Sequence, residues 1–364
     1  PSKLGEMKTK PTQYAVRTLN SYGLHPDVIV ARAERPLDDK RKEKLSFASN
    51  VPVEHIISAP DIESIYEVPL NFERDGLSDT LLHLLKLKPK QTDLKDWRLA
   101  VKRLLEAKQE VKIGLIGKYF KTGDFVLADV YISVIEALKH AAAKLGLKPK
   151  IIWLDSTEFE GDKKKLLELK NYDGLLVPGG FGARGIEGKM AAINYARENK
   201  IPYFGLCYGL QLAVIEYARS VLGLKGAQTR EIDPKTLAPV IDLMPEQAAK
   251  LEGKNYGGTM RLGSYAAKLK AGTLARTAYG TSEIVERHRH RYEVNPAYLA
   301  QLEAAGLVFS GRSPAGELVE IVELPTKVHP FFLATQFHPE FKSTLLNPHP
   351  LFLAFIKAAS GRKV

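Results

Sequence analysis

The segment Ile201-Pro-Tyr-Phe-Gly-Leu-Cys-Tyr-Gly-Leu-Gln211 contains Cys207, the one cysteine among 364 residues. An apolar, strand-like run leads into this cysteine, a glycine lies two residues to either side of it, and a helical pattern follows from Leu210 to Leu222. This order is typical of a nucleophile elbow, a tight strand-to-helix turn that presents one side chain at the top of a parallel sheet. The helix start supplies N–H groups and a positive dipole end that favour an anionic sulfur. We therefore predict that Cys207 is a nucleophile; a small buried side chain is the alternative.

Strands alternate with helices in the region around this turn. The expected strands are 111–116, 150–154, 174–177 and 201–204, and the expected helices are 128–145, 187–198 and the helix after Cys207. Such alternation implies right-handed βαβ crossovers and a central parallel sheet. Later strands near 240–243, 257–268, 318–322 and 331–336 should add mixed or antiparallel pairing before a last helix at 351–359. We predict an α/β fold with a central, mostly parallel sheet flanked by helices.

The chain divides near Gln109-Glu110. The part before this point combines short strands with helices and a polar linker that contains Pro89. Its expected strands are 27–31 and 55–58, its expected helices are 61–66, 77–87 and 97–107, and its linker is 88–96. We therefore predict two domains, 1–108 and 109–364.

A base for the cysteine is expected in Gln336-Phe-His-Pro-Glu340. In an extended segment residues i and i+2 face the same side, so His338 and Glu340 would project together. A carboxylate fixes the tautomer of a neighbouring imidazole, and the imidazole in turn ionises a thiol. Taken alone, a His-Pro-Glu sequence is more often an ordinary loop.

A glycine-rich turn completes the candidate site. In Leu175-Leu-Val-Pro-Gly-Gly-Phe-Gly182 an apolar strand ends at a proline and two glycines. Glycines let the backbone aim its N–H groups at a ligand, so Gly180, with the N–H of Tyr208, would form an oxyanion hole. A turn that binds no ligand is the alternative.

Together these motifs resemble class I triad glutamine amidotransferases, and further segments are similar to the CTP synthase family. These segments are Gly5-Glu-Met-Lys-Thr-Lys-Pro-Thr-Gln13, Gly257-Gly-Thr-Met-Arg-Leu-Gly263, Glu286-Arg-His-Arg-His-Arg-Tyr-Glu-Val-Asn295 and Val319-Glu-Ile-Val-Glu323. The resemblance covers nearly the whole chain. It implies the class I glutaminase fold, preceded by part of an α/β amidoligase domain, and a Cys207, His338 and Glu340 triad that releases ammonia from L-glutamine.

The resemblance also implies residues that hold the substrate. Glu231 matches a carboxylate for the α-ammonium of glutamine, and Arg291 matches an arginine whose guanidinium can grip the α-carboxylate bidentately. The substrate-contacting turn is matched by Gly180, Tyr208, Gly209, Leu210 and Gln211. Tyr208 is a departure, because this position is commonly Leu in the family. His288 and His290 have the spacing of metal ligands, but no nearby Cys or Asp completes a set, so we predict a structural role and no metal site.

Nucleotide contacts are implied for the first domain. The pyrimidine-nucleotide site for UTP or CTP is matched by Lys8, Thr9, Lys10, Pro11, Thr12, Gln13 and Lys44, and an ATP contact is matched by Ile62. A surface loop is the alternative for each. In the family, ATP and magnesium serve the amidoligase reaction, GTP activates the glutaminase, and the enzyme is a homotetramer.

One departure concerns the ATP-binding part of the amidoligase domain. No Gly-x-x-x-x-Gly-Lys-Ser/Thr motif occurs, and Gly114-Leu-Ile-Gly-Lys118 has the wrong spacing. The chain begins at Pro1, so we expect a fragment without the phosphate loop and magnesium carboxylates. Such a fragment would need no cofactor, would make no CTP from UTP and ATP, and would hydrolyse glutamine weakly.

Composition narrows the class of partner and compartment. The net charge is +11 and the pI is about 9.4, but aromatic residues are not interleaved with a basic stripe, so we predict no nucleic-acid partner. No apolar stretch approaches the ~20 residues needed to span a bilayer, and no secretory signal pattern is present. A single cysteine suits a reducing compartment, so we predict a cytoplasmic location with no membrane contact.

Three rival functions remain open on the sequence. Another triad amidotransferase would keep the triad but should lack the Lys-Thr-Lys-Pro-Thr-Gln and Arg-His-Arg-His-Arg segments. A cysteine peptidase or chaperone-like relative would not need Glu231 and Arg291 to bind a free amino acid. A non-catalytic regulatory or assembly fragment would tolerate Cys207→Ser.

Overall fold

The computed structural model describes residues 7–90, 93–118, 121–122, 125–126, 131–243 and 260–364. Two compact units are present, Pro1–Leu105 and Glu106–Val364. The boundary expected after residue 108 lies three residues from this division. None of the described helices is long and apolar enough to cross a membrane.

The first unit contains a two-stranded parallel sheet. β1 (Ile29–Ala33) pairs with β2 (Ile56–Pro60), with Ile29 opposite Ile56. The helices of this unit are α1 (Lys10–Ser21), α2 (Asp39–Ser49), α3 (Val68–Arg74), α4 (Leu77–Leu84) and α5 (Lys95–Glu106). Its small core is formed by Val16, Ile29, Ala31, Leu45, Val51 and Ile56. The apolar positions of one face of α1 and α2 therefore meet the short sheet.

The helix expected at 61–66 is wrong. Ser64 caps a short 3₁₀ turn, Ile65–Glu67, and the Ser64 N–H donates in turn to the Glu67 carboxylate, which makes a capping box. This cap sets the start of helical structure at Ile65 and leads directly into α3. Helices α1 and α2 were not predicted. The sequence of α2 is strongly charged and shows little helical periodicity, whereas α1 is amphipathic and was missed despite that signal.

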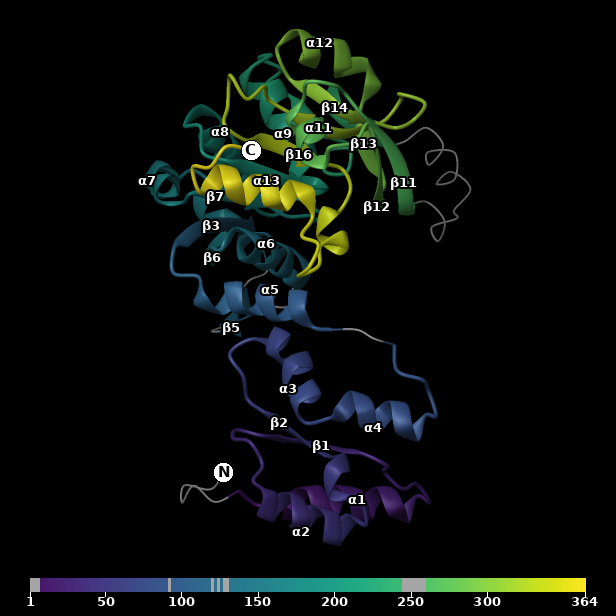
Figure 1. The fold of residues 1–364 in the computed structure, drawn as a ribbon. Coiled ribbons are helices and arrows are strands. Elements are labelled where there is room, and N and C mark those ends of the chain that lie inside the picture. Colours follow the sequence, from purple (N-terminus) through teal and green to yellow (C-terminus); the bar gives the residue numbers. More distant parts are fainter. Residues whose placement is uncertain (1–6, 91–92, 119–120, 123–124, 127–130, 244–259) are drawn as a thin grey trace. The chain divides into compact units, whose positions relative to one another are not determined.

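A nine-stranded sheet organises the second unit, in the order β12-β11-β14-β15-β16-β8-β7-β3-β6 (Figure 1). Its strands are β3 (Glu110–Gly117), β6 (Lys148–Asp155), β7 (Gly174–Val177), β8 (Tyr203–Leu206), β11 (Arg261–Leu269), β12 (Glu283–His290), β14 (Val308–Arg312), β15 (Val319–Glu323) and β16 (Phe332–Thr335). The strands from β6 to β16 pair in parallel, and those from β16 to β12 pair antiparallel. The α/β class is confirmed, and the antiparallel half is larger than expected.

Smaller elements complete the second unit. A three-stranded sheet is formed by β9 (Ala227–Thr229), β10 (Ala238–Leu243) and β13 (Tyr292–Val294), and β4 (Lys121–Thr122) pairs antiparallel with β5 (Phe125–Val126). The helices are α6 (Ile132–Leu145), α7 (Lys163–Glu168), α8 (Ile186–Glu198), α9 (Tyr208–Ser220), α11 (Leu274–Tyr279), α12 (Leu299–Ala304) and α13 (Pro350–Ala359). The expected helix start at 128–130 and strand start at 257–259 lie outside the described residues.

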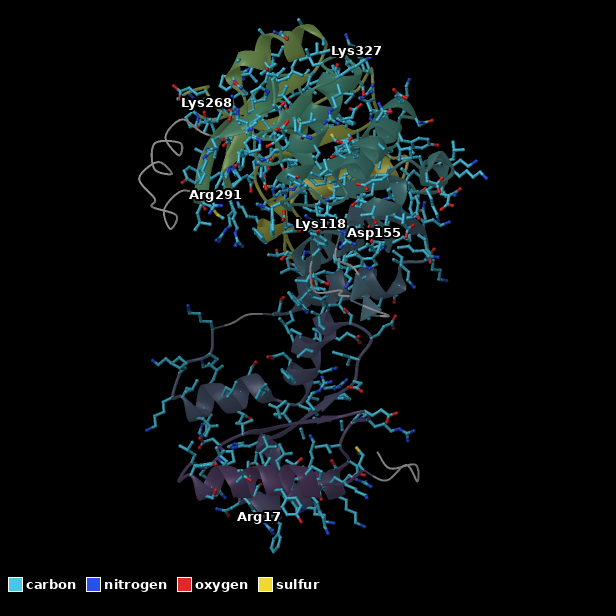
Figure 2. The ribbon with its side chains drawn as sticks, turned by 180° about the vertical axis from the view of Figure 1, so that it is seen from behind. Arg17, Lys118, Asp155, Lys268, Arg291 and Lys327 are labelled. Atoms are coloured by element: carbon cyan, nitrogen blue, oxygen red, sulfur yellow. The ribbon has the colours of Figure 1, made fainter. Side chains whose placement is uncertain are left out.

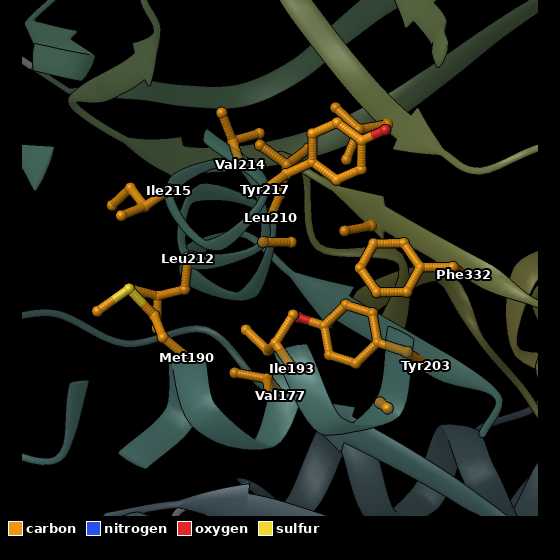
Figure 3. Close-up of a cluster of buried hydrophobic side chains, with 14 of the residues drawn as sticks. Val177, Met190, Ile193, Tyr203, Leu210, Leu212, Val214, Ile215, Tyr217 and Phe332 are labelled. Atoms are coloured by element: carbon orange, nitrogen blue, oxygen red, sulfur yellow. The ribbon is translucent and has the colours of Figure 1, made fainter. Parts of the chain in front are cut away.

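Helices cover both faces of the large sheet. On one face α8 and α9 contribute Met190, Ile193, Leu210 and Val214 to a core that also contains Tyr203 and Phe332 of the strands (Figure 3). On the other face α6 and α13 pack Leu138, Phe352 and Phe355 against β3, β7 and β8. Burying each such side chain stabilises the fold by about 1.5–3 kcal/mol. The carboxyl ends of β7, β8 and β16 are thereby fixed relative to one another.

Candidate active site

Cys207 lies at the turn between β8 and α9, as the nucleophile elbow predicts. Its φ of +50° and ψ of −93° are rare for a residue with a side chain, which indicates a strained turn. Its backbone N–H donates to Thr335 O at 2.6 Å, which ties the turn to the end of β16. The side chain is 6% exposed, so the sulfur lies at the edge of the core.

The two glycines of the elbow are required by close backbone contacts. A Cβ atom on Gly209 would lie 2.4 Å from Val177 O, and one on Gly205 would lie 2.8 Å from the carbonyl carbon of Gly209. Real Cβ atoms do not approach backbone this closely. The close backbone therefore demands glycine on either side of Cys207.

His338 and Glu340 lie together as predicted, although not on a strand. β16 ends at Thr335, and His338 precedes a 3₁₀ turn, Pro339–Lys342, because Pro339 suits the first position of a helical turn. His338 Nδ1 is 2.7 Å from Glu340 Oε1, and the His338 N–H donates to Arg287 O of β12 at 2.8 Å. The imidazole is therefore fixed from both its ring and its backbone.

His338 lies beside Cys207, and both side chains line the same cavity. Burial alone would lower the pKa of His338, but its interactions with Cys207 and Glu340 raise it to about 10. The charged imidazolium is thus favoured at neutral pH. This arrangement places a proton donor beside the sulfur, with a carboxylate on the far side of the ring.

The turn after β7 brings Gly179–Gly182 against the cysteine and histidine. A Cβ on Gly179 would lie 2.9 Å from His338 Cε1 and 3.7 Å from Cys207 Cβ, so only glycine leaves the pair in place. Gly182 N–H donates to Glu231 Oε1 at 3.1 Å, and Lys118 Nζ donates to Phe181 O. The Tyr208 hydroxyl donates to Gly182 O at 3.0 Å. Three side chains from different elements therefore hold this loop.

Substitution of Tyr208 tests whether its hydroxyl anchors the loop that contains Gly182. Tyr208→Phe removes the hydroxyl and leaves the partly buried Gly182 O without its donor, so the free energy of unfolding should fall by about 0.5–1.5 kcal/mol. We also expect a several-fold loss of activity in ammonia release, because the loop loses one of its three anchors. Urea unfolding and glutaminase kinetics check this, with Tyr14→Phe, an exposed tyrosine of α1, as the control. Unchanged stability and kinetics would contradict the anchoring role of the hydroxyl.

A cavity of about 630 Å³ opens beside the cysteine. Its polar lining brings together Cys207, His338, Glu340, Gln211, Glu231 and Arg291. Arg291 is labelled in Figure 2, and its buried Nε has no hydrogen-bond partner among the described residues. The carboxylate of Glu231 and the guanidinium of Arg291 therefore face one space with the sulfur, and opposite charges there suit a zwitterion.

The remaining predicted contacts divide into two groups. Gly180 and Gln211 line the cavity, whereas Tyr208, Gly209 and Leu210 do not. Tyr208 and Leu210 point into the core and Gly209 packs on Val177 O, so only their main chain is available to a ligand. The expected contacts of these three residues with glutamine are therefore contacts of the backbone, and they stay a prediction.

Sequence reasoning missed two groups that touch the sulfur. Gln336 Nε2 donates to Cys207 Sγ at 3.6 Å, and Arg289 O lies 3.9 Å from the same atom. Gln211 donates to Gln336 Oε1 at 3.3 Å and to Tyr292 O at 3.0 Å, which fixes the Gln336 amide. Gln336 lies two residues before His338. Because residues i and i+2 of an extended segment face the same side, this spacing could have predicted that Gln336 also faces the cysteine.

The two histidines of β12 belong to a buried polar network. His288 Nδ1 lies 2.9 Å from His290 Nε2, and Arg261 pairs with Glu320 at 2.8 Å and with Glu293 at 3.4 Å. Burial and the Arg261 charge lower the pKa of His288 to about 2 and that of His290 to about 3, so both rings are neutral. The predicted structural role of these histidines agrees with this packing.

Residues 126–358 match the family model of glutamine amidotransferase class-I, and residues 1–87 match that of the CTP synthase N-terminus. The chain belongs to the class-I glutamine amidotransferase family. Its second unit is a glutamine amidotransferase domain of the CTP synthase type.

Individual relatives support this assignment. The chain is 52% identical to the CTP synthases of Thermococcus gammatolerans and Pyrococcus furiosus, over 99% of its own length and 66% and 65% of theirs. It therefore spans slightly less than two thirds of these relatives. A structure of the Trypanosoma brucei CTPS glutaminase domain with bound acivicin aligns with 70% of this chain and 95% of that one, at 38% identity and a TM-score of 0.64.

The match of residues 1–87 bears on the first unit of this amidotransferase. It gives no support to the expectation that the ATP-binding part is lacking. Thr9 caps the start of α1 by position, Gln13 Nε2 donates to Thr9 Oγ1 at 3.1 Å, and Lys8 and Lys10 are exposed. Lys44 is exposed on α2, and Ile62 is half-buried after β2. The residues expected to contact a pyrimidine nucleotide thus lie around the start of α1 and on α2, and these two helices contact each other.

Proposed function

We propose that this chain hydrolyses the side-chain amide of L-glutamine and releases ammonia. One observation carries the proposal: the strained Cys207 lies beside His338, which is held at 2.7 Å by Glu340, in a cavity that also presents Glu231 and Arg291. The first three residues are the parts of a nucleophilic triad, and the last two suit a free amino acid.

The first half of the reaction forms a thioester. The Cys207 sulfur, with its proton held on His338, attacks the amide carbon of glutamine. The carbonyl oxygen becomes an anion, which the N–H groups of Gly180 and Tyr208 stabilise. His338 gives its proton to the amide nitrogen, the carbon–nitrogen bond breaks, and ammonia leaves a glutamyl group on the sulfur.

The second half releases glutamate. His338, now neutral, accepts a proton from water, and the resulting hydroxide attacks the thioester carbon. The carbon–sulfur bond breaks, and the sulfur returns to its starting state beside the imidazolium. Glu340 keeps the ring oriented and stabilises its charged form in both halves. Because Glu340 is buried, its carboxylate acts on the ring with little screening by water.

The wider activity is part of the same proposal. By its similarity to CTP synthases, the ammonia would aminate UTP that ATP has activated, giving CTP, with GTP as activator and UTP or CTP at the Lys8–Gln13 and Lys44 positions. A homotetramer and a cytoplasmic location belong to this proposal as well. Among the described residues, no group of three or more His, Cys, Asp or Glu is arranged for a metal ion.

A choice of substrates separates this function from that of a cysteine peptidase of the same fold. Glu231 requires the α-ammonium of a free amino acid, so N-acetyl-L-glutamine should be hydrolysed at least 100-fold more slowly than L-glutamine, as expected when a buried charge loses its partner. Ammonia release measures both rates. Equal use of the two compounds, or cleavage of a glutamine-containing peptide bond, would contradict the amidotransferase proposal.

A further inference from the structure

Lys189 is placed where a cation is unfavourable. It lies in the first turn of α8, where the helix dipole presents positive charge, and its side chain is fully buried. Its Nζ atom has no hydrogen-bond partner among the described residues. A buried ammonium without partners costs stability, so its presence calls for a reason outside the fold.

The charged neighbours of Lys189 do not compensate for this burial. Lys118, at the end of β3, is a second cation, and Asp155, at the end of the adjacent β6, is the nearby anion (Figure 2). Tyr208 of α9 places its ring 5.5 Å from the Lys189 nitrogen, which gives a cation–π contact. Burial and the Lys118 charge lower the pKa of Lys189 to about 8 against the opposing effect of Asp155. The amine therefore keeps its proton at neutral pH and loses it above this range.

The ammonium lies under the loop that would bind the oxyanion. A Cβ atom on Gly180 would stand 3.9 Å from Lys189 Nζ and 3.7 Å from Tyr208 Cδ1. Lys189 therefore approaches both residues whose N–H groups are proposed to meet the developing negative charge. Lys118 anchors the same loop through Phe181 O, so its charge is engaged by a carbonyl, whereas that of Lys189 is not.

We propose that Lys189 is a positioning residue of the glutaminase reaction, whose buried ammonium supplies positive charge beneath Gly180 and Tyr208 and stabilises the anionic intermediate formed there. This inference rests on the proposed function. In a dry site, a fixed charge acts on a developing anion with little screening and needs no reorganisation during the reaction. The unfavourable location of the amine is then explained by a trade of stability for activity.

Lys189→Met tests the charge while it keeps the length and bulk of the side chain. We expect kcat for ammonia release to fall about tenfold or more with KM little changed, since the charge acts on the intermediate and does not contact the bound substrate. The melting temperature should be equal to or higher than that of the wild type, because a buried cation is removed. Lys164→Met, at an exposed lysine of α7, controls for the loss of one positive charge and should change neither quantity.

The pH dependence of kcat separates the effect of the Lys189 charge from the effect of the shape of its side chain. Below about pH 8 the ammonium is present, so the ratio of wild-type kcat to Lys189→Met kcat should be largest there and fall toward one as the pH rises to 9–10. Taking this ratio removes the contributions of groups that both proteins share, which are His338, Tyr208, Glu231, Lys118 and Asp155. Stability should change in the opposite sense. Lys189 is protonated up to higher pH in the unfolded chain, so the wild type should gain stability relative to Lys189→Met between pH 8 and 10.5.

The outcomes distinguish this inference from the proposed function. If the wild type releases ammonia and Lys189→Met has the same kcat at every pH, the inference is wrong and the proposed function stands. A variant that fails to fold, or that is less stable and loses activity in proportion, would show that the amine serves the fold and would also overturn the inference. If the wild type itself released no ammonia from glutamine, both would fail.

Discussion

Replacement of Cys207 by alanine is expected to lower ammonia release from L-glutamine by a factor on the order of 10⁴ to 10⁶, as for the loss of other triad nucleophiles. The thioester cannot form without the sulfur, and His338 then has no thiol to ionise. A spectrophotometric ammonia assay with wild-type and variant proteins at equal concentration measures the loss. Turnover by the alanine variant within about tenfold of the wild type would contradict the assignment of Cys207.

The fold should tolerate this change, which makes the result interpretable. Apart from its interaction with His338, the sulfur makes two weak contacts, with Gln336 at 3.6 Å and Arg289 O at 3.9 Å, so the free energy of unfolding should change by only about 1–2 kcal/mol. Cys207→Ser provides the matched control, because it keeps a polar atom in the same turn but replaces the thiolate by a poor nucleophile. We expect the serine variant to be folded and nearly inactive.

Replacement of Arg291 by alanine is expected to lower kcat/KM for glutamine by roughly 10²- to 10³-fold, because a desolvated charge partner of the substrate is worth about 2–5 kcal/mol. Arg291 lines the cavity, and its buried Nε has no partner among the residues that the structure describes, so the guanidinium is free to receive a carboxylate. Glu231→Gln should have a similar effect through the α-ammonium. Steady-state kinetics over a wide glutamine range measure both losses.

The rate of alkylation of Cys207 shows whether these variants lose only glutamine binding or also the reactivity of the thiol. Alkylation of Cys207 by iodoacetamide, which has no α-amino acid group, should keep its wild-type rate in both variants. Arg230→Ala is the matched control, because Arg230 is adjacent to Glu231 but pairs with Asp242 outside the cavity lining, and its glutamine kinetics should be normal. Normal glutamine kinetics in Arg291→Ala and Glu231→Gln would show that the cavity binds another molecule.

The parallel half of the sheet and the triad could be predicted from local sequence. Strand 174–177 agrees in both bounds, and the elbow around Cys207 and the pairing of His338 with Glu340 follow from short segments whose glycines and spacing carry the geometry. These features depend on neighbours in the chain. Their physical constraints, a close backbone at Gly209 and a fixed imidazole at His338, act within a few residues of the motif.

The remaining features depend on contacts between distant segments. β12 was quoted as a motif but not assigned to a strand, because its alternating arginines and histidines have no apolar face in sequence; its His288 and His290 are buried against Arg261 and Glu320 from other strands. Lys189 was predicted only as part of a helix, because nothing in its local sequence indicates that its side chain is buried close to Gly180. Tyr208 was a recognised departure, but its bond to Gly182 O, 26 residues away, required the folded chain.

The reaction of the chain with a glutamine-like diazo-ketone tests the central claim most directly. Mass spectrometry of proteolytic peptides would locate the adduct after treatment at neutral pH. We expect one adduct per chain, on Cys207, with protection by excess L-glutamine, slower labelling in His338→Asn and none in Cys207→Ala. An adduct on another residue, or labelling of Cys207 that glutamine does not slow, would contradict a glutamine site built on this cysteine.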